Sequence, residues 1–376
     1  MTSLVCDNSG CSHCLPTTTH GMHSSHPAEP TFGHSMSCCV DCSIRVQADL
    51  RQVRSLKRIS AFMDELFLVV GRTTSLRTLI GARTTTQGVL ELSVRMKQQA
   101  DESSFDPTLT TSGERDEMVS HNACRVLLRY YAGIIALLFK ALEFPLKTRE
   151  INVRQVQAIQ AIILTTPNSP EHSKVAPIHT MLEITPKRPF LPNEYPGLSQ
   201  LLGTRGVYMD ITRRQYGDVP GLAPVSTYPA LEISSGQLAP EVIGATYHDH
   251  LRQIRHGIQD PQKPLVECLE AEAIVRTINN AFYRHFVVNG GHAIFSHFDD
   301  KAHESTVSKI IEHVKEDVEH LMQFCWVGNW MGIPQAKAES MHKDIVRSCE
   351  GKGHTMITAV LEETSGLQLA SLEEIF

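Results

Sequence analysis

The stretch VSHNACRVLLRYYAGIIALLFKALEF, residues 119–144, is the most hydrophobic in the chain and decides the expected fold class. Pro145 follows it directly, and a proline cannot continue a helix. Its most apolar part, residues 130–139, lies between Arg129 and Lys140. This part is about half as long as a helix that spans a bilayer. We therefore predict a buried helix at the centre of a mainly α-helical protein, with no membrane span.

Helical periodicity continues on both sides of this stretch. Apolar residues recur at intervals of three and four from Ile44 onward, and a weaker helical pattern covers residues 87–99, before a polar linker at residues 101–117. Further expected helices are 153–163, 241–256, 265–288, 306–327 and 335–349. The tail from Met356 is compatible with one short strand or helix.

The middle of the chain has a different composition. Residues 167–240 hold eleven of the nineteen prolines, so long regular elements are not expected there. A loose alternation of apolar residues predicts short strands at 177–184 and 206–211. The expected organisation has four parts. They are a Cys/His-rich segment (1–42), a basic helix with the first helical half (43–166), a Pro/Gly-rich irregular insertion (167–240) and a second helical half (241–376).

The first 42 residues contain six of the ten cysteines and five histidines. Two Cys-x-x-Cys pairs stand out, Cys11 with Cys14 and Cys39 with Cys42, and each pair can hold two corners of a tetrahedral zinc site. Alternate ligands in the same segment are Cys6, Cys38 and His13. A metal-free tail and a redox role are the alternatives to zinc. The chain starts without the apolar run of an export signal, so we expect reduced thiols and an intracellular location, in the cytoplasm or nucleus.

A basic segment follows the cysteine cluster. Residues 43–100 contain ten Lys or Arg residues against four acidic ones, whereas the first 42 residues contain no Lys or Arg. Basic side chains off the apolar stripe of the first helix would contact a protein partner or a polyanion such as nucleic acid. These side chains are Arg45, Arg51, Arg54, Lys57 and Arg58.

The carboxyl-terminal half offers a second candidate site, rich in His and acidic residues. In a metal-dependent enzyme these residues would bind the metal ion or act as general acid and base. The candidate residues are His297, Asp299, His303, His313, Glu316 and His320. Facing helices would supply further ligands from residues 248–250 or from Glu267, Glu270 and Glu272. The alternative is a solvated helix face with favourable local charge pairs.

Nucleophilic catalysis receives little support from the sequence. We interpret Cys124, Cys268, Cys325 and Cys349 as core cysteines, because they lie in helical and mostly apolar surroundings. The chain contains neither a Gly-x-Ser-x-Gly elbow nor the glycine-rich phosphate loops of nucleotide-binding proteins.

The leading hypothesis is therefore a regulatory or adaptor protein with a zinc-stabilised amino-terminal module and an adjoining basic helix, associated with nucleic acid or a protein partner. The first alternative is a metal-dependent enzyme with its site in the carboxyl-terminal half. The second is a capsid-like or scaffold protein, in which the irregular middle forms subunit contacts.

Overall fold

The computed structural model describes residues 40–97, 110–121, 123–155, 162–166, 169–174, 178–191, 195–214, 221–226, 231–233, 240–259, 265–330 and 334–369. Within these residues the protein is mainly helical, as the sequence predicts. The helices are α1 (Val40–Thr74), α2 (Ser112–Ser120), α3 (Cys124–Lys140), α4 (Pro196–Leu202), α5 (Ala245–Gln259), α6 (Leu265–Val288), α7 (Ala293–Ser296), α8 (Asp300–Trp330), α9 (Gln335–Ser348) and α10 (Lys352–Ser365).

The strands form two sheets. They are β1 (Arg77–Thr84), β2 (Leu90–Met96), β3 (Leu146–Gln155), β4 (Ile162–Thr166), β5 (Ser169–Lys174), β6 (Ile178–Pro186), β7 (Val207–Met209), β8 (Leu222–Pro224), β9 (Leu231–Ile233) and β10 (Glu241–Val242). The smaller sheet has the order β1-β2-β4-β5, and its β2 and β4 are parallel. The larger sheet has the order β10-β3-β6-β7-β8 and is antiparallel, with β9 also paired to β3.

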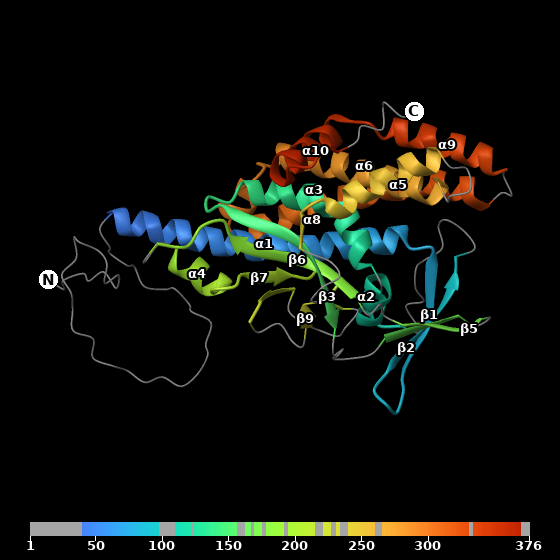
Figure 1. Cartoon of the computed structure of the whole chain (residues 1–376), viewed down its shortest axis with the longest axis horizontal. Coiled ribbons are helices and arrows are strands. Elements are labelled where there is room, and N and C mark those ends of the chain that lie inside the picture. Colours follow the sequence, from blue (N-terminus) through green and yellow to red (C-terminus); the bar gives the residue numbers. More distant parts are fainter. Residues whose placement is uncertain are drawn as a thin grey trace.

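The helices gather on one side of the larger sheet, and the smaller sheet lies at one end of the molecule (Figure 1). One hydrophobic core joins the helices to the larger sheet, because a single buried cluster runs from Leu56 of α1 to Leu361 of α10 and includes Leu182 and Ile184 of β6. The smaller sheet has a separate buried cluster, which includes Leu92. The two helical halves and the middle segment therefore share a core.

Helix α3 is the most thoroughly buried element of this core. It packs against α5, α6 and α10 and against strand β6. Contact with α10 is so close that a side chain at Gly133 would meet the side chain of Ile357. Its apolar character thus follows from neighbours in the protein. Within the described residues, no single helix is both long and apolar enough to cross a membrane, and α2 with α3 passes that test only as a pair bent by 87°.

Two side-chain contacts fix where the middle segment lies. Asp49 of α1 is buried and accepts hydrogen bonds from the backbone N–H groups of Gly197 and Leu198, at 2.6 and 2.9 Å, in the first turn of α4. Glu150 of β3 does the same for α5, accepting from the N–H of Gly244 at 2.6 Å and that of Thr246 at 3.0 Å. Both carboxylates satisfy helix N–H groups that have no partner within their own helix.

The turn into β7 requires a glycine. Gly206 has a φ of +88°, and a Cβ there would collide with the carbonyl oxygen of Ile184 on β6. Only glycine adopts this conformation in so tight a space without strain. The turn sets β7 against β6, so that Met209 pairs with Leu182.

Several expected elements differ from the structure. The helical pattern at 87–99 is the strand β2, and the helix expected at 153–163 is occupied by the end of β3 and the start of β4. The hydrophobic stretch at residues 119–144 belongs to two helices, because α2 ends at Ser120 and α3 begins at Cys124. The strands expected at 177–184 and 206–211 are confirmed as β6 and β7, and the helix expected at 265–288 is confirmed as α6.

The Asp49 contact is testable. We expect Asp49→Ala to lower the free energy of unfolding by about 1–2 kcal/mol, because two N–H groups at the start of α4 lose their acceptor. Chemical denaturation measures the loss. The control is Gln47→Ala, an exposed position on the same helix, and equal stability of the two variants would contradict the capping role.

Candidate active site: a buried cysteine, histidine and aspartate

Cys124 is the first residue of α3, and its side chain is 6% exposed. The residue before it, Ala123, provides no side-chain hydrogen bond to cap the helix. The first N–H groups of a helix lack intrahelical partners and carry partial positive charge, which favours a thiolate at this position. The burial of Cys124 agrees with its interpretation as a core cysteine, but the sequence placed it inside a longer helix and the structure places it at the start of one.

Two further polar residues reach Cys124 from the larger sheet. His179 lies near the start of β6, where it pairs with Val153 of β3. Asp210 follows the last residue of β7, and its backbone N–H donates to the carbonyl of Gly221 at 2.8 Å. His179 is 0% exposed and Asp210 is 1% exposed. The antiparallel pairing of β6 and β7 thus brings these two side chains to one end of the sheet.

The three side chains form a chain of interactions with the imidazole in the middle. Nε2 of His179 lies 2.9 Å from Oδ2 of Asp210, and the interaction of the same ring with the Cys124 thiol lowers the pKa of that thiol. Oδ1 of Asp210 accepts from the backbone N–H and the hydroxyl of Thr212, at 3.0 and 3.3 Å. The backbone N–H of Thr180 also donates to the sulfur of Cys124. Every member of the chain is therefore held by a second contact.

The environment stabilises the charged forms of both Cys124 and His179. Burial by itself would raise the pKa of the Cys124 thiol, but the hydrogen bond and charge of His179 and the N–H of Thr180 outweigh it, and the pKa lies below its ordinary value. Burial would also lower the pKa of His179, but the charge and hydrogen bond of Asp210, with the contact to Cys124, raise it to about 9. Both shifts favour a thiolate and imidazolium pair at neutral pH.

A group of ion pairs ties the segment that carries Asp210 to the segment that leads into Cys124. Arg213 pairs with Asp64 of α1 at 2.7 Å, and the neighbouring Arg214 pairs with Asp116 of α2. Asp116 is buried and also pairs with Arg72 of α1. Because α2 ends four residues before Cys124, these contacts hold both arms of the site against α1.

The sequence predicts an amino-terminal zinc site, and most of its residues are not among those that the structure describes. Its ligands Cys11, Cys14 and Cys39, and the alternates Cys6, Cys38 and His13, lie outside the described residues, as does the side chain of Cys42. Zinc binding by this segment stays a prediction.

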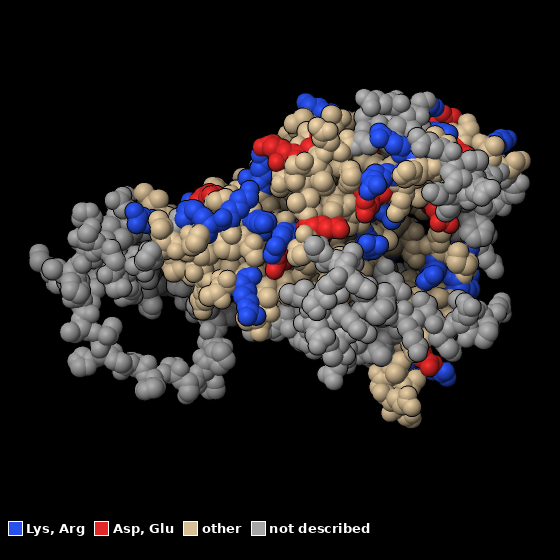
Figure 2. Space-filling view, in the orientation of Figure 1, with Lys and Arg blue, Asp and Glu red and all other residues tan. Residues whose placement is uncertain are grey.

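The basic residues of α1 fall into two groups. Arg45, Arg54 and Lys57 are exposed, but Arg58 is 8% exposed and donates to the carbonyl of Phe298 at 2.9 Å while pairing with Asp300. Arg51 is half-buried and pairs with Glu143. On the face shown in Figure 2, basic side chains have acidic ones beside them. Arg58 therefore joins α1 to α8 and does not belong to a contact surface.

The structure does not bring the carboxyl-terminal candidates together. His303 is directed at the carbonyl of Ile294, His313 pairs locally with Glu316, and the other candidates are exposed at separate places: His297, Asp299 and His320. Of the facing residues, His250 and Glu272 do meet inside the protein, at 3.5 Å. Glu272 there also accepts from Arg276 at 3.0 Å, so its charge is compensated by an arginine.

Among the described residues, no group of three or more His, Cys, Asp or Glu side chains is arranged to hold a metal ion. Cys124, His179 and Asp210 do not form such a group either. They are arranged in series, with the imidazole in the middle. Series geometry is the arrangement of a nucleophile, a base and a group that orients the base.

Comparisons of the chain with protein-family models, with curated proteins and with solved structures gave no match. The interpretation of the site therefore rests on its geometry.

The lowered thiol pKa predicts how Cys124 reacts with iodoacetamide. A lowered pKa keeps the thiolate at lower pH, so alkylation of Cys124 should fall little between pH 9 and pH 7. In His179→Asn the burial penalty remains without the cation, and the rate at pH 7 should fall at least about tenfold. Peptide mass spectrometry assigns the modified residue. Cys268, whose pKa burial raises, is the internal control and should lose reactivity steeply as the pH falls.

Glu117 of α2, beside the ion pairs, gives a pH-dependent prediction. Burial, then the charges of Glu114 and Asp116, raise the pKa of Glu117 to about 7, although Arg214 opposes the shift. The folded state therefore keeps the proton up to a higher pH than the unfolded chain, and stability is lost as the pH rises from 4.5 through 7. Glu117→Gln should remove this pH-dependent decrease in stability. The decrease amounts to about 1 kcal/mol of unfolding free energy after discounting for solvent screening.

Urea denaturation at pH 5 and pH 8 measures this effect. The stability of Glu117→Gln relative to the unmodified protein should increase between the two pH values. Glu304→Gln, at an exposed position on α8, is the control and should show no such increase. A Glu117→Gln difference that is the same at both pH values would contradict the raised pKa.

Proposed function

We propose that the protein is an enzyme that transfers acyl groups through the thiol of Cys124, acting on an amide, ester or thioester. The observation that carries the proposal is the position of the His179 ring, between the sulfur of Cys124 and the carboxylate of Asp210. A core cysteine needs neither a charged histidine nor a carboxylate behind it. Burying these two charges is unfavourable unless they are well paired, so their presence here favours a functional role.

The residues suggest the following steps. The Cys124 thiolate attacks the carbonyl carbon, and the tetrahedral intermediate collapses as the His179 imidazolium gives its proton to the leaving amine, alcohol or thiol. The neutral imidazole then removes a proton from water or another acceptor, which attacks the thioester and releases the acyl group. The proton taken from the acceptor makes His179 an imidazolium again, and the departing sulfur of Cys124 is again a thiolate.

Asp210 and the start of α3 have separate parts in this mechanism. Asp210 holds the imidazole in position through Nε2, and it stabilises the imidazolium without taking the proton. The backbone N–H of Cys124 is among the first of α3 and has no intrahelical acceptor. It is therefore suited to stabilise the negative oxygen of the tetrahedral intermediate.

The regulatory hypothesis from the sequence is a second candidate function, favoured only by the cysteine spacing of the first 42 residues. It is compatible with a thiol enzyme, because a metal-binding segment could recruit the enzyme to a partner. Metal analysis of the purified chain, compared with a variant in which Cys11 and Cys39 are both serine, tests it. Equal zinc content in the two proteins would remove it.

The enzymatic proposal is tested with an activated ester, 4-methylumbelliferyl acetate. We expect hydrolysis with an acetyl group trapped on the Cys124 peptide in early turnover, loss of activity in Cys124→Ser, and a decrease of about 10²–10⁴-fold in Asp210→Asn. The matched control is Cys268→Ser, at a half-buried cysteine of α6, which should keep full activity.

Two outcomes would contradict the proposal. One is activity that survives Cys124→Ser, and the other is an acetyl group found only on other cysteines. Thermal unfolding of each variant separates a chemical loss from a failure to fold.

A further inference from the structure

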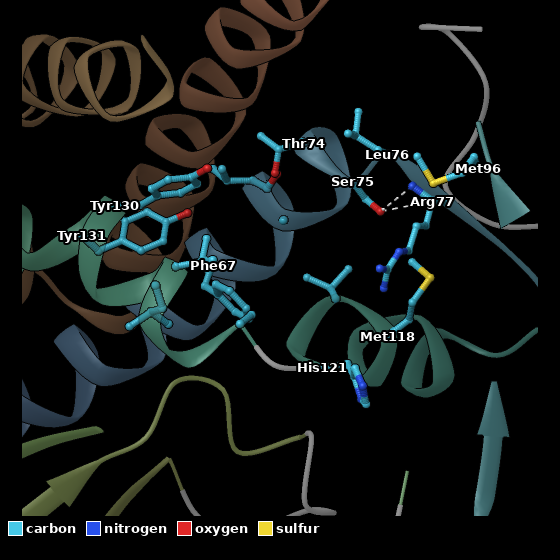
Figure 3. Close-up of a pocket in the computed structure, with 16 residues that line it drawn as sticks. Phe67, Thr74, Ser75, Leu76, Arg77, Met96, Met118, His121, Tyr130 and Tyr131 are labelled. Atoms are coloured by element: carbon cyan, nitrogen blue, oxygen red, sulfur yellow. Dashed lines mark hydrogen bonds between the residues drawn. The ribbon is translucent and has the colours of Figure 1, made fainter. Parts of the chain in front are cut away.

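A cavity of about 370 Å³ lies beside the first turn of α3, between the end of α1, the smaller sheet and α2 (Figure 3). Ala123, Val126 and Leu127 form its α3 wall, so the cavity borders the residue before Cys124 and the turn that follows it. Met118 and His121, at the end of α2, form the wall that leads to Cys124 along the chain. The volume is within the range of pockets that bind small organic groups.

The cavity lining is mainly apolar. Most of the surrounding side chains are aromatic, aliphatic or thioether groups, among them Phe67, Leu76, Met96, Met118, Leu127 and Tyr130. Thr74, Ser75, Arg77 and His121 are the polar side chains of the lining. A large apolar surface with a few polar groups is the composition of a site that binds an apolar ligand and orients it.

Tyr131 provides a second, independent observation. Its side chain is 1% exposed, and its hydroxyl has no hydrogen-bond partner among the described residues. In Figure 3 the hydroxyl points from α3 toward the middle of the lining side chains. A buried hydroxyl without a partner is unfavourable, and a hydrogen-bond acceptor on a bound ligand would remove that penalty.

We infer that this cavity binds the acyl part of the substrate, and that this part is an N-acylaminoacyl or peptidyl group with a bulky apolar side chain. The inference rests on the proposed function of Cys124. Such a group carries an amide carbonyl on its α-nitrogen in addition to the reacting carbonyl, and the amide oxygen would accept a hydrogen bond from Tyr131, whereas the reacting oxygen lies at the N–H of Cys124. A fatty acyl chain would fill the same apolar space but would leave the hydroxyl of Tyr131 without an acceptor.

The inference is tested with 4-methylumbelliferyl esters of N-acetylphenylalanine, N-acetylglycine and octanoic acid. We expect kcat/KM to be at least about tenfold higher for the phenylalanyl ester than for the glycyl ester, as for a buried aromatic side chain. The phenylalanyl ester should also exceed the octanoyl ester. Tyr131→Phe should lower kcat/KM about fivefold for the phenylalanyl ester and leave the octanoyl ester unchanged. Preference for the glycyl or the octanoyl ester would overturn the inference.

A pair of neighbouring threonines supplies matched variants. Thr73 and Thr74, at the end of α1, are both half-buried, and each donates its hydroxyl to the carbonyl four residues before it at 3.0 Å. Only Thr74 lines the cavity. Thr74→Phe should lower kcat/KM for the phenylalanyl ester at least about tenfold more than for the acetyl ester, and Thr73→Phe should change neither. Equal effects of the two variants would overturn the inference.

Two further measurements keep the result unambiguous. Should Thr74→Phe fail to fold, Met96→Trp narrows the same cavity from an exposed lining residue and should give the same selective loss.

Should every ester be inert, the proposed function fails by itself. The cavity is then tested by calorimetric titration of Cys124→Ser with N-acetylphenylalanine amide, where binding that is lost on adding Thr74→Phe supports it and absence of binding overturns it.

Discussion

The burial of most of α3 in the core is the constraint on which the rest of the structure depends. The helix packs against α5, α6 and α10 and against β6, so its axis cannot shift without opening the core. Its first residue, Cys124, is therefore held at a fixed place relative to the sheet that carries His179 and Asp210. A reactive thiol needs this fixed geometry, because a hydrogen bond to the base is lost when either partner moves by about 1 Å.

The same burial imposes an electrostatic requirement. A thiolate and an imidazolium in a dry interior are each unfavourable, and together they are stable only when their remaining hydrogen bonds are satisfied. Here Asp210 compensates the imidazolium, Thr212 holds Asp210, and the N–H of Thr180 supports the sulfur. The ion pairs of Arg213 and Arg214 with Asp64 and Asp116 hold the surrounding backbone. Polar groups from β6 and the segment after β7 thus surround the thiol, and polar groups of α1 and α2 hold the segment after β7 in place.

Periodicity in the sequence predicted the long helices well, because their apolar faces repeat over several turns, and α6 agrees with its expected range, 265–288. It failed at two strands, β2 and β3, whose apolar residues also fit helical spacing. The expected helix at 153–163 took Val153 of β3 and Ile162 and Ile163 of β4 into one helical pattern, although the buried pair Ile151 and Val153 has the two-residue spacing of a strand. Strand β2 alternates buried Leu90, Leu92 and Val94 with half-buried residues, but seven residues fit a weak helical pattern as well. Pairing with neighbouring strands decided these cases, and no local pattern contains that information.

The candidate site was hidden for a related reason. The expected helix began at Val119 and placed Cys124 in its second turn, where a cysteine is an ordinary core residue. The structure ends α2 at Ser120 and starts α3 at Cys124, and this difference of a few residues places the thiol at a helix amino terminus. His179 and Asp210 were within strands that the sequence predicted, yet a polar residue in a strand gains chemical meaning only when the strand order is known. Cys124, His179 and Asp210 meet because β6 pairs with β7 and packs on α3, so their proximity is a property of the fold and not of any motif.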